Sequence, residues 1–309
     1  MGITHLSGLQ VAGVPTFGVG NDLPLGAHYF FVDSATGNNG NDGSYDTPLA
    51  TLDYAIGLCT ASKGDTIVIK PDHAETITGA GGITADIAGI NIIGLGAGQQ
   101  RPRFLMDGGT TVTFLITAAD VLVRNIILAA GHADIVTGIG ITAAGVTLDA
   151  VEFVNNVVDE NFLTEIKCTS TSDNNADGLT VINCRAITVD ASALEMIEIN
   201  ADLDRGTFCN NFMCKDAATA GKMILQATGK DLTNLLCTWN NTMSGMTTGD
   251  LFIDNDTTAN SGIVAYNMIG HHDVAGPITV DCDGVRQFNN YSAASDTASG
   301  RLWPAVETT

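Results

Sequence analysis

Basic residues are scarce in this sequence. Only 13 Lys and Arg stand against 34 Asp and Glu, which gives a formal net charge of −21. The basic residues are scattered from Lys63 to Arg301 without any basic run. Because neutralising phosphates requires clustered Lys and Arg, the sequence argues against nucleic acid and against an anionic membrane surface as partners.

Three other absences narrow the class of protein further. No stretch reaches the roughly 18 apolar residues of a membrane span, and residues 1–13 lack the basic and apolar regions of a secretion signal. The seven Cys form no CxxC pair, so neither a zinc site nor a full disulfide framework is indicated. We therefore expect a soluble protein that is synthesised in a host cytoplasm.

Aromatic residues make up only 6% of the chain, whereas 35 Gly are present. That composition is typical of a protein with many turns and small side chains and is unusual for a helical enzyme. Hydrophobic residues reach 45% and charged residues only 15%, so the chain can bury a large core and is not disordered. A length of 309 residues is compatible with two domains or with one elongated all-β domain.

The first 63 residues differ in character from the rest. Residues 1–27 carry Gly and Pro without sustained periodicity, which predicts an extended N-terminal arm. Residues 28–63 begin with a short apolar run at Tyr29, continue with a polar Gly, Asn and Asp loop, and end with an amphipathic segment from about Pro48 to Thr60. We interpret 28–63 as an N-terminal cap made of a strand, a polar loop and a short capping helix.

From residue 64 to residue 292, short apolar runs rich in Val, Ile, Thr and Phe recur in pairs. The second run of each later pair carries an Asn, or once an Asp. The steps between these markers are 24, 34, 28, 30, 26 and 23 residues, a mean of 27.5. Such spacing leaves no room for crossover helices. The markers are Asn125, Asp149, Asn183, Asn211, Asn241, Asn267 and Asn290.

The pattern predicts an all-β fold, a parallel β-helix over 64–292 with a solenoid of about eight rungs. The recurrent Asn suits a corner of such a coil, because its small amide tolerates left-handed backbone and can bond to the amide one rung away. A two-sheet sandwich built from the same short strands is the alternative. Residues 293–309 are expected to form a C-terminal tail.

The polar loop from Asp33 to Asp46 alternates oxygen ligands with Gly, as a hard cation such as calcium requires. It lacks the closing Glu of an EF-hand. A polar turn braced by its own hydrogen bonds is the alternative, and no other cofactor is indicated. The candidate calcium ligands are Asp33, Asn39, Asp42 and Asp46.

Carboxylates dominate the charged residues, so paired acid chemistry of the glycosidase kind has to be considered. Spacing singles out none of them, and a solvated acidic surface is the alternative interpretation. The aromatic platforms and basic residues that accompany sugar cleavage are sparse, with only two Trp, Trp239 and Trp303. The candidate carboxylates are Asp149, Glu152, Glu165, Glu195, Glu198, Asp202, Asp204, Asp254 and Asp256.

The stretch from Tyr29 to Met106 resembles the start of right-handed parallel β-helix proteins with the pectate-lyase-like fold. The resemblance implies this fold over most of the chain and does not imply lyase activity. The basic and Asp/His motifs of the lyases have no counterpart here, so no catalytic role is carried over. The segments that carry the resemblance are Phe31-Val-Asp33 with the polar loop, Thr47-Pro-Leu-Ala-Thr-Leu-Asp-Tyr-Ala-Ile56, Gly64-Asp-Thr-Ile-Val-Ile-Lys-Pro71 and Ile92-Ile-Gly-Leu-Gly96.

The opening segment, Thr4-His-Leu-Ser-Gly-Leu-Gln-Val-Ala-Gly13, resembles the start of short head proteins of tailed bacteriophages. This resemblance implies a non-enzymatic virion protein of the capsid decoration or cement type. It would dock as a homotrimer on the outer surface of the phage head, with the major capsid protein as its partner. The interface candidates lie in the arm and the tail: Ile3, His5, Leu6, Leu9, Val11, Val14, Phe17 and Trp303.

The alternative function is a carbohydrate-active β-helix, either a tailspike depolymerase or a polysaccharide lyase. Such a protein would use a carboxylate pair as acid and base along one sheet. An exposed groove that holds two carboxylates about 5 to 9.5 Å apart beside an aromatic side chain would favour this function, whereas an aromatic-poor convex shaft would favour the mechanical role.

Overall fold

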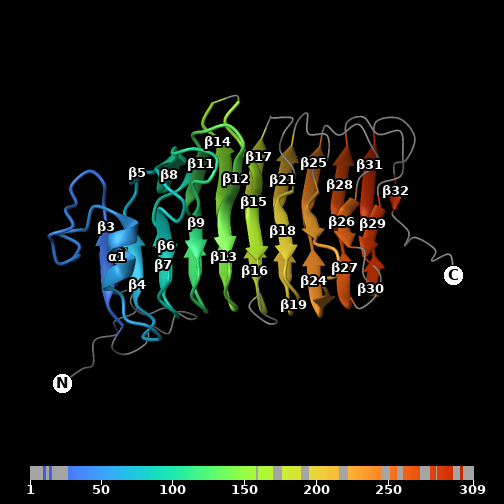
Figure 1. Ribbon diagram of the computed structural model, residues 1–309, viewed down its shortest axis with the longest axis horizontal. Coiled ribbons are helices and arrows are strands. Elements are labelled where there is room, and N and C mark those ends of the chain that lie inside the picture. Colours follow the sequence, from blue (N-terminus) through green and yellow to red (C-terminus); the bar gives the residue numbers. More distant parts are fainter. Residues whose placement is uncertain are drawn as a thin grey trace, which may run out of the picture.

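The computed structural model describes residues 10–11, 14–15, 27–157, 159–169, 176–188, 195–215, 222–244, 251–255, 260–271, 279–282, 284–294 and 300–301. The chain winds as a right-handed parallel β-helix, with strands of successive circuits side by side along the long axis (Figure 1). The predicted fold class is confirmed. The alternative sandwich is wrong, because neighbouring strands run parallel. No helix in the described part of the chain is long and apolar enough to cross a membrane.

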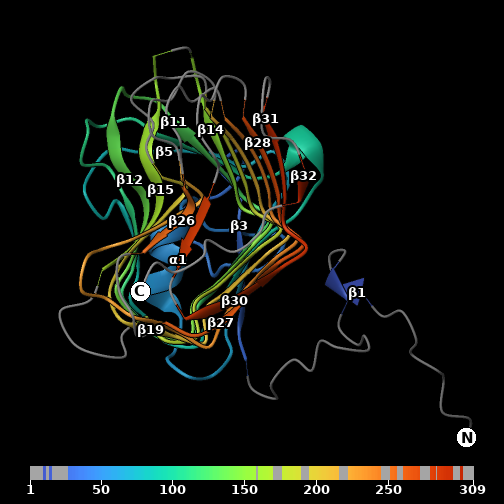
Figure 2. The same cartoon turned by 90° about the vertical axis from the view of Figure 1, so that its right-hand side faces the viewer.

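Three long sheets form the walls of the β-helix, and Figure 2 shows them around a common interior in a view along the axis. After the first strand of sheet 1, each circuit adds a strand to sheet 1, then to sheet 2, then to sheet 3. Sheet 1 contains β3 (Tyr29–Val32), β4 (Thr66–Ile69), β7 (Asn91–Gly94), β10 (Leu122–Arg124), β13 (Thr147–Asp149), β16 (Thr180–Ile182), β20 (Thr207–Cys209), β24 (Leu235–Thr238), β27 (Gly262–Ala265) and β30 (Val285–Phe288).

Sheets 2 and 3 are built in the same way. Sheet 2 contains β5 (Ala74–Ile77), β8 (Arg103–Met106), β11 (Ile127–Ala130), β14 (Glu152–Asn155), β17 (Arg185–Thr188), β21 (Phe212–Lys215), β25 (Asn241–Ser244), β28 (Met268–His271), β31 (Tyr291–Ala294) and the antiparallel β32 (Gly300–Arg301). Sheet 3 contains β6 (Ile83–Ala85), β9 (Phe114–Ile116), β12 (Ile135–Ile141), β15 (Phe162–Thr169), β18 (Ile197–Asn200), β22 (Ile224–Gln226), β26 (Leu251–Asn255) and β29 (Thr279–Cys282).

Smaller elements complete the chain. Strands β1 (Gln10–Val11) and β2 (Val14–Pro15) pair antiparallel, and β19 (Leu203–Asp204) pairs in parallel with β23 (Leu232–Thr233). A short 3₁₀ helix spans Gly98–Gln100. Helix α1 (Leu52–Leu58) packs against β3, β4 and β6.

Helix α1 is shorter than the segment predicted from about Pro48 to Thr60. Leu49 forms a parallel bridge with Val32, and Thr51 is still extended at the N-cap, so the helix begins only at Leu52. It buries Leu52, Ala55 and Ile56 against the solenoid. Strand β3, which lies in the segment expected to form a cap, is hydrogen-bonded to β4 as the first strand of sheet 1.

Columns of apolar side chains fill the interior, because alternate residues of a strand point to the same face and the parallel register places equivalent residues above one another. Each fully buried aliphatic or aromatic side chain contributes about 1.5–3 kcal/mol. One unbroken column of fully buried residues in sheet 1 is Ile67, Ile92, Val123, Leu148, Val181, Phe208, Cys237 and Val264.

A two-residue corner joins sheet 1 to sheet 2 in seven consecutive circuits. Most of the predicted second runs therefore contain parts of two strands that meet at a corner. The first corner residue has left-handed backbone with φ between 52° and 61°. These residues are Asn125, Ala150, Asn183, Asn210, Trp239, Tyr266 and Asn289.

A ladder of buried Asn side chains lies directly behind the last four corners. Asn240 Oδ1 accepts hydrogen bonds from the backbone N and the Nδ2 of Asn211, both at 3.0 Å. Asn267 Oδ1 accepts the equivalent bonds from Asn240 at 2.9 and 3.0 Å. Asn290 continues the ladder. The predicted amide-to-amide bonding is thus present, but the ladder residue follows the left-handed residue and is distinct from it.

We expect Asn240→Ala to lower the free energy of unfolding by at least about 1–3 kcal/mol, because it leaves buried donors and acceptors on the neighbouring circuits without partners. Urea unfolding followed by circular dichroism measures the loss. Asn241→Ala, one residue further on and outside the buried ladder, is the matched control. An equal loss in the two variants would contradict a stabilising role for the ladder.

Candidate functional site

The corner between sheets 1 and 2 carries two unusual residues. In five of its seven circuits the left-handed position holds Asn or Ala, whereas the circuits of β24 and β27 place Trp239 and Tyr266 there, with φ of 61° and 58°. Left-handed backbone costs a non-glycine residue roughly 1–2 kcal/mol, and Asn relieves part of this cost by local hydrogen bonding. Bulky side chains at such positions point to a role other than stability.

The two aromatic side chains are exposed and stack on one another. The ring centroids of Trp239 and Tyr266 lie 4.7 Å apart with the planes 6° from parallel. Phe288, on the next circuit, meets Tyr266 edge-on at 5.5 Å. The exposed fractions are 63% for Trp239, 40% for Tyr266 and 37% for Phe288. Three successive circuits therefore present an aromatic row to solvent.

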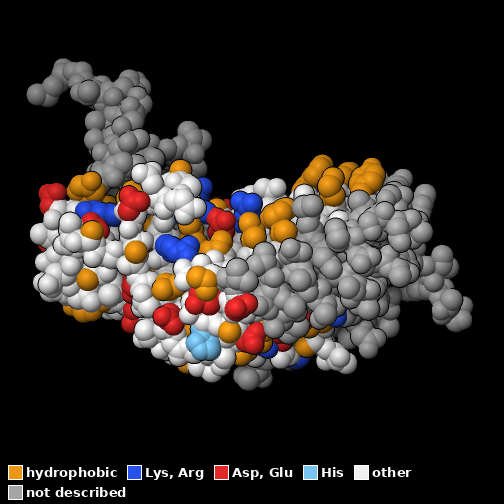
Figure 3. Space-filling view, turned by 90° about the horizontal axis from the view of Figure 1, so that it is seen from above, with side chains coloured by type: hydrophobic (Ala, Val, Ile, Leu, Met, Phe, Trp, Pro, Cys, Tyr) orange, Lys and Arg blue, Asp and Glu red, His pale blue; other side chains and the backbone are white. Residues whose placement is uncertain are grey.

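Apolar side chains flank this aromatic row on both sides. Leu236 and Ile263 lie beside it on sheet 1, and Met268 and Tyr291 lie beside it on sheet 2, all of them exposed. Figure 3 shows hydrophobic side chains gathered at the C-terminal end of the upper edge of the molecule. The segments 207–213, 235–244, 262–271 and 285–294, which form these corners, contain no Asp or Glu.

Toward the N-terminal end the same corner becomes polar. Asn210 Nδ2 donates to Asn183 Oδ1 at 2.7 Å, and Asn183 Nδ2 donates to Asp149 Oδ1 at 2.7 Å. These amides stand one per circuit, in line with Trp239 and Tyr266. A hydrogen-bonded polar line therefore leads directly into the aromatic row.

The polar line ends in a cluster of arginines and carboxylates. Arg124 Nε lies 3.2 Å from Asp149 Oδ2, and Glu152 pairs with Arg101 and, at 3.9 Å, with Arg185. The Arg185 guanidinium also lies over the Phe212 ring, 5.3 Å from its centroid. This cation–π contact joins the charged cluster to the aromatic end.

We call this continuous surface the corner strip. It comprises Arg101, Arg103, Arg124, Asp149, Glu152, Asn183, Arg185, Asn210, Phe212, Leu236, Trp239, Ile263, Tyr266, Met268, Arg286, Phe288 and Tyr291.

A second polar cluster lies inside the solenoid, near the corner where sheet 2 leads to sheet 3. Lys215 Nζ lies 3.0 Å from Glu165 Oε2, with both side chains fully buried, although the two groups are not aligned for a hydrogen bond. Burial raises the pKa of Glu165, and the nearby Lys215 charge opposes this rise. Burial likewise raises the pKa of Glu195, again opposed by Lys215. This buried cluster is separate from the corner strip.

The structure separates the carboxylates that the sequence proposed as candidates. Asp149 and Glu152 lie on the corner strip, while Glu165 and Glu195 belong to the buried cluster. Glu198 pairs with Lys167 at 2.8 Å. The remaining candidates lie elsewhere: Asp202 and Asp204 flank the small sheet of β19 and β23, the side chain of Asp254 lies outside the described residues, and so does Asp256.

The loop proposed to bind calcium uses its oxygens for its own hydrogen bonds. Asp33 accepts bonds from Ala35 N and Thr36 Oγ1, and Asp42 accepts bonds from Ser44 N and Thr47 Oγ1. The bond from Thr47 and then those from Ser44 lower the pKa of the exposed Asp42. At Asp33 burial raises the pKa, but the bonds from Thr36 and Ala35 and the nearby Lys70 charge outweigh it, so that this pKa is lowered as well.

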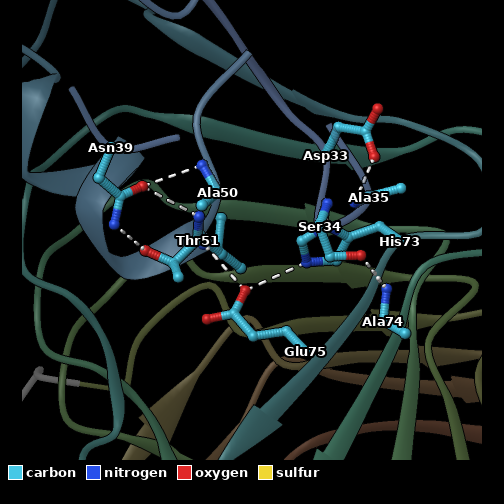
Figure 4. A network of polar contacts seen from close by, with 10 residues as sticks. Asp33, Ser34, Ala35, Asn39, Ala50, Thr51, His73, Ala74 and Glu75 are labelled. Atoms are coloured by element: carbon cyan, nitrogen blue, oxygen red, sulfur yellow. Dashed lines mark hydrogen bonds and ion pairs between the residues drawn. The ribbon is translucent and has the colours of Figure 1, made fainter. Parts of the chain in front are cut away.

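Asn39 and its neighbours brace the loop against helix α1 (Figure 4). Asn39 Oδ1 accepts bonds from the backbone N of Ala50 and of Thr51, and Glu75 Oε2 accepts a bond from Leu52 N. Across the described residues, no group of three or more His, Cys, Asp or Glu side chains could hold a metal ion. Asp46 is exposed and does not join this network, so the loop has the geometry of the braced polar turn.

The predicted interface residues lie almost wholly outside the described residues. This applies to Ile3, His5, Leu6, Leu9, Phe17 and Trp303, whereas Val11 and Val14 are placed only as backbone in β1 and β2. The homotrimer, the partner and the location therefore stay predictions without a structural test.

Sequence reasoning missed the aromatic row, although a signal for it was present. The motifs WNN, YNM and FNN place an aromatic residue one or two positions before the recurrent Asn in three successive repeats. Only the Asn was used as a marker. Aligning these motifs would have brought Trp239 and Tyr266 to equivalent corner positions, with Phe288 on the next circuit opposite Ala265, one residue before the corner.

Neither a protein-family model nor a curated protein matches the sequence. Among solved structures, the chain resembles a GH136 lacto-N-biosidase from Eubacterium ramulus. The native structure gives a TM-score of 0.44 at 10% identity, and the selenomethionine derivative gives 0.42 at 12%, each covering 87% of this chain and 68% of that chain. A rhamnogalacturonan lyase gives a TM-score of 0.37 at 11% identity, covering 90% of both chains. At these values the likeness concerns the fold and does not extend to activity or substrate.

The predicted virion decoration function is corrected by these neighbours. The neighbours are named as a GH136 lacto-N-biosidase and a rhamnogalacturonan lyase, and none of them is named as a virion protein. No finding supports the phage origin or the capsid role that the ten-residue resemblance at the N-terminus implied. The parallel β-helix fold implied by the longer resemblance, from Tyr29 to Met106, is confirmed.

The buried acid cluster predicts how stability depends on pH. Because folding raises the pKa of Glu195 above its ordinary value of 4.5, its contribution is fully present below about pH 4.5 and is lost as pH rises through the folded pKa. We expect the unfolding free energy to fall as the pH rises from about 4.5 through the folded pKa of Glu195, and to fall less steeply in Glu195→Gln. Urea unfolding at several pH values measures both slopes, with the exposed Asp159→Asn as control. Identical slopes in the wild-type protein and both variants would contradict a raised pKa of Glu195 in the folded state.

Proposed function

We propose that this chain is a carbohydrate-active β-helix protein that binds a linear glycan lengthwise along the corner strip. The observation that carries the proposal is the exposed aromatic row, in which Trp239 and Tyr266 occupy strained positions that Asn fills elsewhere. A flat aromatic face with polar groups at its edge suits a sugar ring, which has apolar C–H faces and a rim of hydroxyls.

The periodicity of the strip favours a repeating polymer. Aromatic and amide groups recur once per circuit, at the roughly 4.8 Å spacing of neighbouring strands. A compact small molecule would use only one or two circuits. Single-stranded nucleic acid also stacks on aromatic rows, but it needs a basic groove that follows its phosphates, and the corner segments that carry the aromatic row contain a single Arg, Arg286, and no Lys.

Replacing Trp239 and Tyr266 by Asn separates binding from folding. Each stacked ring is worth about 0.5–1.5 kcal/mol, so the double variant W239N/Y266N should weaken glycan binding roughly tenfold. Its stability should be unchanged or higher by about 1–2 kcal/mol, because Asn tolerates left-handed backbone. Affinity gel electrophoresis with linear polysaccharides measures the binding, and urea unfolding measures the stability.

Tyr54→Ala is the matched control for this test, because Tyr54 is an equally exposed aromatic residue on α1, away from the corner strip. Wild-type binding in this variant is expected. If the wild-type protein binds no linear glycan, or if W239N/Y266N binds as well as wild type, the proposed function is wrong.

Asp149 and Glu152 are the carboxylates on the strip, and we propose them as the pair for any acid–base cleavage of the bound glycan. The variants D149N and E152Q should each reduce the release of reducing ends by about a hundredfold or more. Binding should persist, because the aromatic row is intact. Asp86→Asn, an exposed carboxyl at the end of sheet 3, is the control. Equal rates in D149N, E152Q and the control would assign the strip to binding alone.

A further inference from the structure

Five of the seven Arg residues in this acidic chain gather on the corner strip. They are scattered in the sequence, yet the winding of the chain brings four of them to its N-terminal part and one to its C-terminal end. Figure 3 shows basic side chains on the same face as the hydrophobic ones, nearer the N-terminal end. The five residues are Arg101, Arg103, Arg124, Arg185 and Arg286.

The charge of the strip is opposite in sign to that of the whole chain. At its N-terminal part Arg101, Arg124 and Arg185 pair with the two carboxylates Asp149 and Glu152. The fourth Arg of this part, Arg103, bonds the neutral Asn156, so the formal charge is +2 (four minus two). Arg286 adds a further positive charge at the other end, and the corner segments between carry no acid. With a net charge of −21 on the molecule, a positive strip marks a surface that attracts anions.

Of the three arginines that pair with carboxylates, one is anchored and two are available. Arg101 is only 16% exposed and is engaged with Glu152. Arg124 contacts Asp149 through Nε, and its side chain is 54% exposed. Arg185 is 53% exposed and lies 3.9 Å from Glu152, too far for a hydrogen bond. A guanidinium has five N–H donors, so both exposed groups can still bind an anion.

From this arrangement we propose that the glycan on the corner strip carries anionic substituents, carboxylate or sulfate, and that Arg124 and Arg185 bind them. The inference rests on the proposed function and specifies its substrate class. Arg124 and Arg185 lie on circuits two steps apart, so their guanidinium groups meet substituents roughly 10 Å apart along the axis. The forked donors of Arg suit the paired oxygens of carboxylate and sulfate. The aromatic row then holds the uncharged faces of the same polymer.

The test compares three polymers by affinity gel electrophoresis: dextran as the neutral glycan, dextran sulfate as its sulfated counterpart, and alginate as a carboxylate polymer. Wild-type protein should bind one or both anionic polymers at least roughly tenfold more tightly than dextran, since each charge-assisted hydrogen bond adds this much. Raised salt should reduce that advantage. Preference for dextran sulfate alone or alginate alone identifies the substituent.

The double variant R124A/R185A should lose the anionic preference while W239N/Y266N loses affinity for all three polymers. Arg205→Ala is the matched control, because Arg205 is also exposed but pairs with Asp204 away from the strip. Asn183 still bonds Asp149 and Arg101 still pairs with Glu152 in R124A/R185A, so its fold is preserved. Binding of dextran as tight as that of the anionic polymers, or R124A/R185A binding like R205A, overturns this inference alone. Binding to none of the polymers overturns the proposed function as well.

Discussion

Parallel hydrogen bonding between successive circuits is the constraint on which this molecule depends. Each strand bonds to the equivalent strand of the next circuit, so every residue lies about 4.8 Å above its counterpart. The 4.7 Å separation of the Trp239 and Tyr266 rings reproduces this spacing. Because the backbone sets the repeat, any residue type that recurs in the sequence becomes a column in space. Core, amide ladder and corner strip are three such columns.

The type of side chain in each column changes along the axis, and different columns change at different circuits. The corner between sheets 1 and 2 passes from charged groups around Asp149, through the amides of Asn183 and Asn210, to the aromatic rings that begin at Trp239. Behind it, the ladder of Asn211, Asn240, Asn267 and Asn290 secures the later corners. The circuits with the most strained corners therefore have the most extensive buried hydrogen bonding, which offsets the cost of placing Trp and Tyr there.

The class of fold could be predicted from the sequence because the recurrent Asn and the short apolar runs are local signals. The corner that divides a long run into two strands could not be predicted. A residue such as Ala150 gives no sign in the sequence that its backbone is left-handed. The candidate site depends on which residues share a column, and circuits of unequal length hide that alignment. Arg124 and Arg185 are 61 residues apart in the chain but only two circuits apart in space, so a scattered charge pattern became a local one. The N-terminal resemblance misled because ten residues outside the repeating body carry no information on what its surface can bind.

Since each circuit contacts only its immediate neighbours, the solenoid behaves as a stack of modules. A further circuit with an aromatic residue at the left-handed corner would extend the strip by a single step and leave the remaining contacts unchanged. The length of polymer engaged, and with it the avidity, is then set by how many modules carry the ring rather than by remodelling of a pocket. The amide-bearing circuits around Asn183 and Asn210 are the places where this architecture could be lengthened by substitution of single residues.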